Sequence, residues 1–219
     1  YRDEMGFLPE AVNNYLLRLG WGHGDEEIIS QEQAIEWFDI KDVGKGAARF
    51  DFAKLTNLNG VYLRQADDTR LANDIAPLIA KQIGVDAIDA AQKEILIKGM
   101  SGLKERAKTL IELADSSAFY VTDGVMSFNE KAQSLIDSAP EGLFAELAKE
   151  LDALENWTEE NVDASVRNIA EKLDQKLGKV AQPLRAVLTG SNSSPGIFEV
   201  MIVLGKSQTL KRIRKFDAQ

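Results

Sequence analysis

The residue types best suited to binding another molecule are concentrated in residues 182–198, which read QPLRAVLTGSNSSPGIF. A helix that carries Arg185 is expected to run into a loop of glycine, serine, asparagine and proline, which then opens onto another helix. Such a loop offers backbone N–H and C=O groups, hydroxyl groups and a helix N-terminus, which suit phosphates and the edges of unpaired RNA bases. The alternative is an ordinary helix–helix connector in which Arg185 pairs with a carboxylate. The residue types alone leave both interpretations open.

Two other short motifs contain residue types found in catalytic sites, but their spacing argues against catalysis. The Gly-Lys-Gly sequence of residues 44–46 lacks the Gly-x4-Gly-Lys-Ser/Thr pattern of a phosphate-binding loop, and no strand pattern precedes it. The Gly-His-Gly-Asp sequence of residues 22–25 has no nucleophile or second histidine at a recognisable spacing. We therefore interpret both segments as turns or loops.

The composition excludes several classes of site. The sequence has no cysteine, which excludes disulfides, thiolate zinc sites and cysteine nucleophiles. His23 is the only histidine, which excludes a multi-histidine metal site. The longest apolar runs, such as residues 200–204, are far shorter than the ~20 residues that a membrane span needs. Since no secretory signal is visible either, the sequence predicts a cytoplasmic protein without a membrane partner.

Charge is distributed unevenly along the chain. The net charge is −9, which is the wrong sign for a simple nucleic-acid binder, because phosphates are contacted by Lys and Arg. Residues 161–219 nevertheless hold ten basic and five acidic residues, a net of +5, so residues 1–160 carry −14. This asymmetry suggests a basic surface with a function. Taken by itself, the KRIRK run of residues 211–215 is more typical of a solvated helix face.

Nearly every segment has the 3.6-residue period of an amphipathic helix. Helix starts are indicated by Pro9, by a capping box at Ser30 and Gln33, and by Thr158. Glycines that follow the apolar stripes indicate the helix ends. They are Gly20, Gly84, Gly178 and Gly205.

No strand pattern of alternating apolar and polar residues persists in the sequence. Residues 61–63 (Val-Tyr-Leu) are interpreted as at most a brief extended or irregular stretch. Breaks in the helical pattern fall near residues 65–68 and 123–129. The sequence therefore predicts an all-α architecture in three parts, with helices joined by short loops.

Three stretches together resemble one protein family. They are residues 1–21 (YRDEMGFLPEAVNNYLLRLGW), residues 50–64 (FDFAKLTNLNGVYLR) and residues 182–198. In this order, and over essentially the whole chain, they are similar to the C-terminal part of bacterial glutamyl-tRNA synthetases. In that family the Tyr-Arg-Asp segment closely follows the Lys-Met-Ser-Lys-Ser-type active-site loop. The resemblance therefore implies that this chain, which starts at Tyr1, is a piece that begins just past the catalytic core.

The resemblance also implies the organisation of the fold. It predicts an all-α chain with a helical stem-contact region at residues 1–68. Two helix-cage anticodon-binding subdomains are expected to follow, at residues 69–129 and 130–219.

A set of site residues follows from the same resemblance. Arg185 matches the arginine with which the family contacts the anticodon. Ser194, Pro195, Gly196 and Ile197 match the loop that packs around the anticodon bases, where Thr-Pro-Gly-Leu is an equivalent form. Serine keeps the hydroxyl group of threonine, and isoleucine keeps the apolar contact of leucine.

One position departs from the family pattern. In some members, an arginine a few residues before a Leu-Lys-Glu sequence reads the third anticodon base. Counting back from residues 103–105 (Leu-Lys-Glu), this place falls at about Gly99, which has no side chain to donate a hydrogen bond. Losing a good base contact relaxes discrimination by about 1–3 kcal/mol. We therefore hypothesise tolerance of the glutamine anticodon, with the neighbouring Lys98 as a candidate substitute reader.

These features together predict recognition of the anticodon arm of tRNA-Glu, and of tRNA-Gln if discrimination is relaxed. The resemblance implies a monomeric glutamate–tRNA ligase whose ATP and Mg²⁺ sites lie in a missing N-terminal catalytic domain, so no catalytic residue, metal or cofactor is expected here. The alternative is a helical protein–protein interaction module without RNA binding. An RNA module predicts that the basic residues of 161–219 share one face with Arg185 and the 190–196 loop. A scaffold predicts an exposed apolar patch instead.

Overall fold

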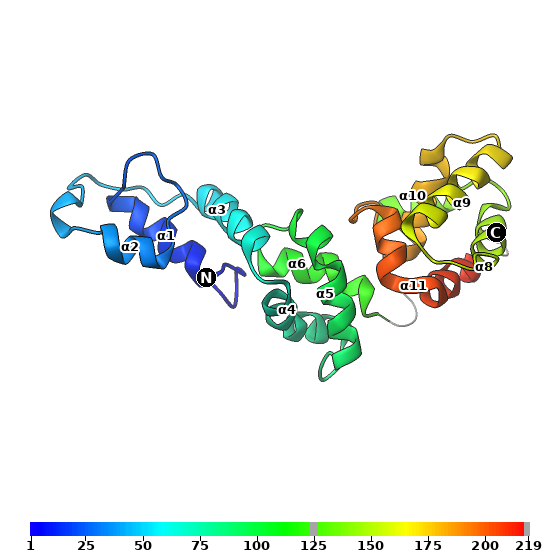
Figure 1. The fold of residues 1–219 in the computed structure, drawn as a ribbon, viewed down its shortest axis with the longest axis horizontal. Coiled ribbons are helices and arrows are strands. Elements are labelled where there is room, and N and C mark those ends of the chain that lie inside the picture. Colours follow the sequence, from blue (N-terminus) through cyan, green and yellow to red (C-terminus); the bar gives the residue numbers. More distant parts are fainter. Residues whose placement is uncertain (123–126, 217–219) are drawn as a thin grey trace.

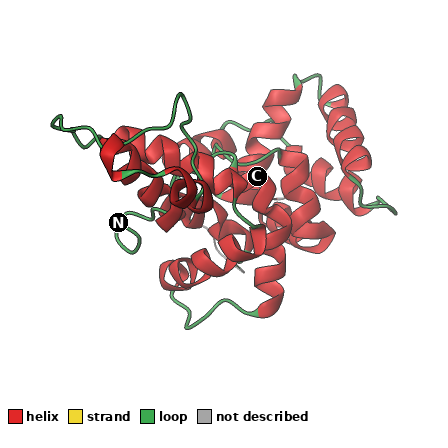
Figure 2. Ribbon diagram, turned by 60° about the vertical axis from the view of Figure 1, so that its left-hand side comes forward, coloured by secondary structure: helices red, strands yellow, loops and turns green. Residues whose placement is uncertain are grey.

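The computed structural model describes residues 1–122 and 127–216. Within these residues the chain forms α-helices and short 3-10 helices and contains no strand, which confirms the all-α prediction (Figure 2). None of the described helices is both long and apolar enough to cross a membrane.

The helices follow one another in three groups along an elongated molecule (Figure 1). The first group contains α1 (Pro9–Gly20), α2 (Gln31–Trp37), η1 (Ile40–Asp42) and α3 (Phe52–Gln65). The second contains α4 (Asp68–Ile83), α5 (Ala90–Lys104), α6 (Leu110–Ser117) and η2 (Ala118–Tyr120). The third contains α7 (Glu130–Asp137), α8 (Leu143–Asp152), α9 (Glu159–Lys172), α10 (Leu177–Thr189), α11 (Ile197–Ile213) and η3 (Arg214–Phe216).

These groups follow the order of the predicted regions 1–68, 69–129 and 130–219, whose exact boundaries stay a prediction. The predicted break near 123–129 falls largely on residues 123–126, which lie outside the described residues. A continuous buried core runs through the second and third groups, so the two groups do not have separate cores. A smaller cluster of Phe7, Tyr15 and Leu55 packs α1 against α3.

Several predicted helix ends are confirmed. The Ser30 side chain accepts a hydrogen bond from the Gln33 backbone N–H, and the Gln33 side chain accepts one from the Ser30 N–H, which completes the capping box of α2. Gly84 ends α4 with a left-handed φ of 74°. Gly205 has φ 74° and ψ 165°, so it breaks α11 at the place where two helices are predicted to meet.

Two local predictions are wrong. Residues 61–63 lie inside α3, because Asp51 caps that helix by accepting hydrogen bonds from the N–H groups of Ala53 and Lys54, and the helix continues to Gln65. Gly178 does not end α9, because α9 already ends at Lys172. Asp174 takes the left-handed backbone conformation there, with φ 50°, and Gly178 lies in the first turn of α10.

Exposed apolar side chains occur at the far end of the molecule from α10. Ile35 and Phe38 lie at α2 and Ile40 lies in η1, and they are 74%, 43% and 74% exposed. The apolar side chains at positions 35 and 38, which follow the capping box, are therefore not buried among the described residues. Figure 1 places α2 and α10 in the two outer groups, so these side chains are remote from Arg185.

Candidate functional site

Arg185 lies on α10 and holds the loop that follows that helix. Its Nη1 donates hydrogen bonds to the carbonyl oxygens of Ser194, at 3.1 Å, and Pro195, at 2.7 Å, and also to the Ser194 hydroxyl oxygen. Arg185 therefore binds loop oxygens. Among the described residues, no Asp or Glu forms the ion pair with Arg185 that the connector interpretation predicts. Its Nε and Nη2 groups make no hydrogen bond within those residues, so they remain able to contact a ligand.

The loop itself is held in one shape by hydrogen bonds at its first residues. Gly190 ends α10 with a φ of 72°, and its carbonyl accepts the Asn129 N–H at 3.0 Å. The Thr189 hydroxyl oxygen accepts the Ser191 N–H at 3.2 Å, and the Ser191 hydroxyl oxygen accepts the Ser193 N–H at 3.2 Å. These contacts and those of Arg185 preorganise the loop, which lowers the entropy lost when a ligand binds.

The predicted loop residues differ in how open they are. Ser194, Pro195 and Ile197 are buried, and the Ser194 hydroxyl donates to the Pro195 carbonyl at 2.9 Å. Gly196 is exposed. The buried residues therefore shape the loop from within, whereas Gly196 and the neighbouring exposed Ser193 present backbone and hydroxyl groups to the outside.

A cleft of about 940 Å³ lies between this loop and the second helical group. Arg106, Asp115 and Ser116 line one wall, and loop residues between 189 and 195 line the other. Phe119 and Phe128 add aromatic surface to the lining. The cleft thus combines the guanidinium group of Arg106, the carboxylates of Glu112 and Asp115, hydroxyl groups and aromatic rings, which together can stack on and hydrogen-bond to unpaired bases.

Arg106 is the residue in this cleft that the sequence analysis missed. It is exposed, and its side chain makes no hydrogen bond or ion pair within the described part of the chain. Burial lowers the pKa of Arg185, and the positive charge of Arg106 nearby lowers that pKa further. Because the charges of these two guanidinium groups repel each other, an anion bound near both of them would stabilise both.

A signal for Arg106 was present in the sequence. Leu110-Ile111-Glu112 resembles the Leu-Lys-Glu pattern with isoleucine in place of lysine, and Arg106 stands four residues before it. An alignment of the pattern to residues 110–112, in place of residues 103–105, predicts the reader at Arg106 and not at residues 98–99.

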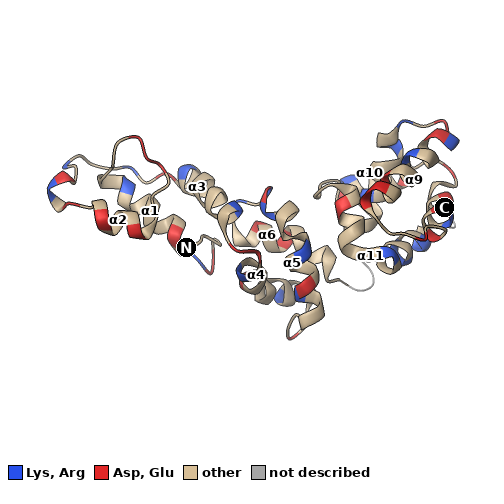
Figure 3. Cartoon of the chain, viewed as in Figure 1, with Lys and Arg blue, Asp and Glu red and all other residues tan. Residues whose placement is uncertain are grey.

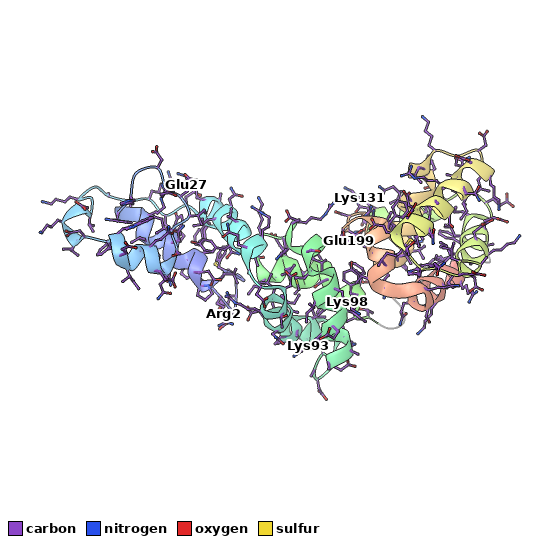
Figure 4. The ribbon with its side chains drawn as sticks, viewed as in Figure 1. Arg2, Glu27, Lys93, Lys98, Lys131 and Glu199 are labelled. Carbon is purple, nitrogen blue, oxygen red and sulfur yellow. The ribbon has the colours of Figure 1, made fainter. Side chains whose placement is uncertain are left out.

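The structure does not bring Gly99 and Lys98 into the cleft. Both lie on α5, and neither is among the lining residues. Lys98, labelled in Figure 4, is exposed. Gly99 is buried, and a Cβ atom built on it would lie 2.6 Å from Cε2 of Tyr120. Glycine at this position is therefore explained by the close packing of the Tyr120 ring.

Replacing Gly99 by alanine is expected to lower the free energy of unfolding by about 1–3 kcal/mol, because the methyl group would force the Tyr120 ring out of place. Urea denaturation measures this change. The matched control is Gly178→Ala in α10, where a Cβ would meet no atom within 4 Å and a change below about 1 kcal/mol is expected. Equal effects of the two substitutions would contradict the packing explanation.

The basic residues of the third group do not share one face with Arg185, so this expectation is wrong. Carboxylates of α8 attract several of them: Lys172 pairs with Glu150, and Arg214 pairs with Asp152 at 2.8 Å. Figure 3 shows basic and acidic residues interleaved over α8, α9 and α11. Among the described residues, the positive charge near the loop includes Arg185, Arg106 and Lys131, an exposed residue of α7 that lines a smaller pocket with Asn192.

The KRIRK run of residues 211–215 is only partly the solvated face that the sequence predicts. Lys211, Arg214 and Lys215 are exposed, but Arg212 and Ile213 are buried. Arg212 Nη2 donates to the carbonyl oxygens of Phe119, at 2.7 Å, and Thr122, at 3.1 Å. The helical period places positions 212 and 213 on the inner side of α11, where Arg212 joins the second and third groups.

Residues 1–122 and 127–216 contain no group of three or more His, Asp or Glu side chains that could hold a metal ion.

Comparison with known proteins gives consistent matches over the chain. Residues 70–216 match the family model described as the anticodon binding domain. Glutamate–tRNA ligase 1 of Sphingopyxis alaskensis is 54% identical over 215 residues, which cover 97% of this chain and 44% of that protein. Glutamate–tRNA ligase 2 of Rhodospirillum rubrum is 50% identical over 219 residues, which cover all of this chain and 46% of that protein.

Solved structures agree with these sequence matches. The crystal structure of a glutamate tRNA ligase from Elizabethkingia meningosepticum in complex with its amino acid has a TM-score of 0.82 and 30% identity. The match covers 100% of this chain and 42% of that one. The chain thus spans less than half the length of these relatives.

Proposed function

The chain belongs to the anticodon-binding domain family as the C-terminal part of a bacterial glutamate–tRNA ligase, and from this premise we propose that its cleft binds the anticodon of tRNA-Glu. The observation that carries the proposal is the guanidinium group of Arg106 in the lining of the cleft, together with the lining residues Ser194 and Pro195, which Arg185 holds through their carbonyl oxygens. Arginine donors read base edges and phosphates, and each well-placed pair of donors is worth about 1–3 kcal/mol of discrimination.

In this proposal Arg185 has two roles. Its Nη1 fixes the loop through the carbonyl oxygens of Ser194 and Pro195, and its remaining donors contact the RNA. Gly196 and Ser193 then supply the exposed loop surface that meets the anticodon bases, while Ser194, Pro195 and Ile197 support it from below.

We further propose that the full-length ligase attaches glutamate to tRNA with ATP and Mg²⁺. We propose that the ATP and Mg²⁺ sites lie in the part of the ligase that is outside this chain, as the family resemblance implies. By the same resemblance, the ligase is proposed to act as a cytoplasmic monomer. No catalytic role is assigned to the residues of this chain.

The preference between tRNA-Glu and tRNA-Gln is proposed to depend on Arg106. Tolerance of tRNA-Gln was expected from Gly99 alone, and the packing of Tyr120 gives that glycine a structural reason. Arg106 faces the cleft with its donors unused, so it can contact an anticodon base. We therefore expect tRNA-Glu to be preferred, and Lys98 to contribute little.

Replacing Arg106 by alanine is expected to raise the Kd for tRNA-Glu about tenfold, and to change the Kd for tRNA-Gln less, because a base contact is lost. Titration with both tRNA transcripts measures this change. The control is Arg167→Ala on α9, an exposed arginine that pairs with Asp163 and does not line the cleft. Wild-type binding of both tRNAs by the Arg106 variant would contradict the assignment. Absence of tRNA binding by the unmodified chain would contradict the proposed function.

A further inference from the structure

Glu199 lies in the first turn of α11, directly after the loop, and reaches the second helical group (Figure 4). Its carboxylate packs against Gly102 of α5. A Cβ atom built on Gly102 would lie 2.8 Å from both Cδ and Oε2 of Glu199, and closer still to Oε1. A side chain at position 102 would therefore displace this carboxylate from its place against the helix.

The charges and N–H groups around Glu199 come from both the second and the third helical groups. Burial and the negative charge of Glu159 raise the pKa of Glu199, whereas Arg106 and the backbone N–H groups of Gly102 and Gly196 oppose this rise. The carboxylate therefore interacts with α5, with Arg106 just beyond α5, and with the loop at Gly196. No ion pair within 4.0 Å joins it to Arg106 among the described residues, so the guanidinium donors of Arg106 stay available to a ligand.

We propose that Glu199 is a positioning residue that seats the loop of the third group against α5 and so sets the spacing between Arg106 and Arg185. The proposal rests on the proposed function, because it concerns the geometry of the anticodon cleft. The two arginines lie on different helical groups, so base reading by both requires a fixed distance between the groups. Binding constellations of this kind must be held within about 0.5 Å of their working geometry. Glu199 is placed to do this, since it is two residues from Ile197 and touches α5 directly.

The first test replaces Glu199 by glutamine in the full-length ligase and measures glutamate attachment to tRNA-Glu transcripts. We expect KM for tRNA to rise about five- to tenfold, with kcat changed less than about twofold, because binding geometry and not chemistry is altered. The preference for the natural anticodon over transcripts with one changed anticodon base is expected to narrow. The control is Glu160→Gln on α9, an exposed carboxylate for which wild-type values are expected.

The second test uses Gly102→Ala, alone and combined with Glu199→Ala. Alone, the added methyl group displaces the carboxylate, so KM should rise as it does in Glu199→Gln. In the Glu199→Ala background nothing remains to be displaced, so Gly102→Ala should add less than about twofold to KM. Additive effects of the two substitutions would overturn the proposal.

The outcomes also separate this proposal from the proposed function. If the Glu199 and Gly102 variants only lose thermal stability while KM and base preference keep their wild-type values, the positioning role is wrong. If the Glu199 and Gly102 variants keep wild-type KM and base preference while Arg185→Ala weakens tRNA binding, the proposed anticodon site is supported and only the positioning role of Glu199 is wrong. If Arg185→Ala also binds tRNA as the wild type does, the proposed function itself is wrong.

Discussion

Replacing Arg185 by alanine is expected to raise the Kd for tRNA-Glu by at least about 30-fold, which corresponds to about 2 kcal/mol. Two losses combine in this variant. The donors that are free to contact the RNA disappear, and the carbonyl oxygens of Ser194 and Pro195 lose the group that holds the loop. A loop that must be ordered during binding lowers affinity even where its own contacts are retained.

Two further variants identify the cause of this effect. Arg185→Lys keeps the charge but not the planar fork of donors, so it should recover only a small part of the affinity. Arg167→Ala removes an exposed arginine of α9 and should leave the Kd unchanged. Wild-type affinity in Arg185→Ala, measured on protein with an unchanged thermal transition, would show that this arginine does not bind tRNA.

Replacing Arg212 by alanine is expected to give the largest loss of stability, about 3–5 kcal/mol in the free energy of unfolding. Arg212 is 4% exposed and donates to the carbonyl oxygens of Leu188, Phe119 and Thr122. These carbonyls belong to α10 and to the segment around η2, so the substitution leaves buried acceptors unpaired where the second and third groups meet.

Urea denaturation measures the Arg212 effect, and Arg214→Ala is its matched control. Arg214 lies two residues further along, is exposed, and pairs with Asp152 at 2.8 Å. Such an exposed ion pair contributes less than about 1 kcal/mol. Similar losses in the two variants would contradict the structural role of the buried guanidinium.

Most of the fold could be predicted from local signals. Caps such as Ser30 and left-handed glycines such as Gly84 act within one turn of helix, so the sequence around them is sufficient. The two wrong local predictions concern residues 61–63 and Gly178, and in each case a different residue determines where the helix starts or ends. Asp51 starts a helix through residues that also suit extended structure, and Asp174 adopts the left-handed conformation that was expected of a glycine.

The candidate site could be predicted only in part, because its parts come from distant segments. The resemblance predicts Arg185 and residues 194–197 as site residues, but the hydrogen bonds from Arg185 to loop carbonyls depend on a turn that only the structure shows. The basic charge of residues 161–219 is visible in the sequence, whereas its pairing with carboxylates of α8 is a tertiary feature. The role of Gly99 likewise depends on Tyr120, which approaches it from another element.

The central claim is that the cleft between the loop and the second helical group holds the anticodon of tRNA. Chemical probing of the tRNA-Glu bases in complex with the full-length ligase tests it most directly. The claim predicts that the anticodon bases are protected by the wild type and become reactive again with Arg185→Ala, while protection elsewhere on the tRNA is retained. Anticodon bases that stay reactive in the wild-type complex, or that stay protected without Arg185, would contradict it.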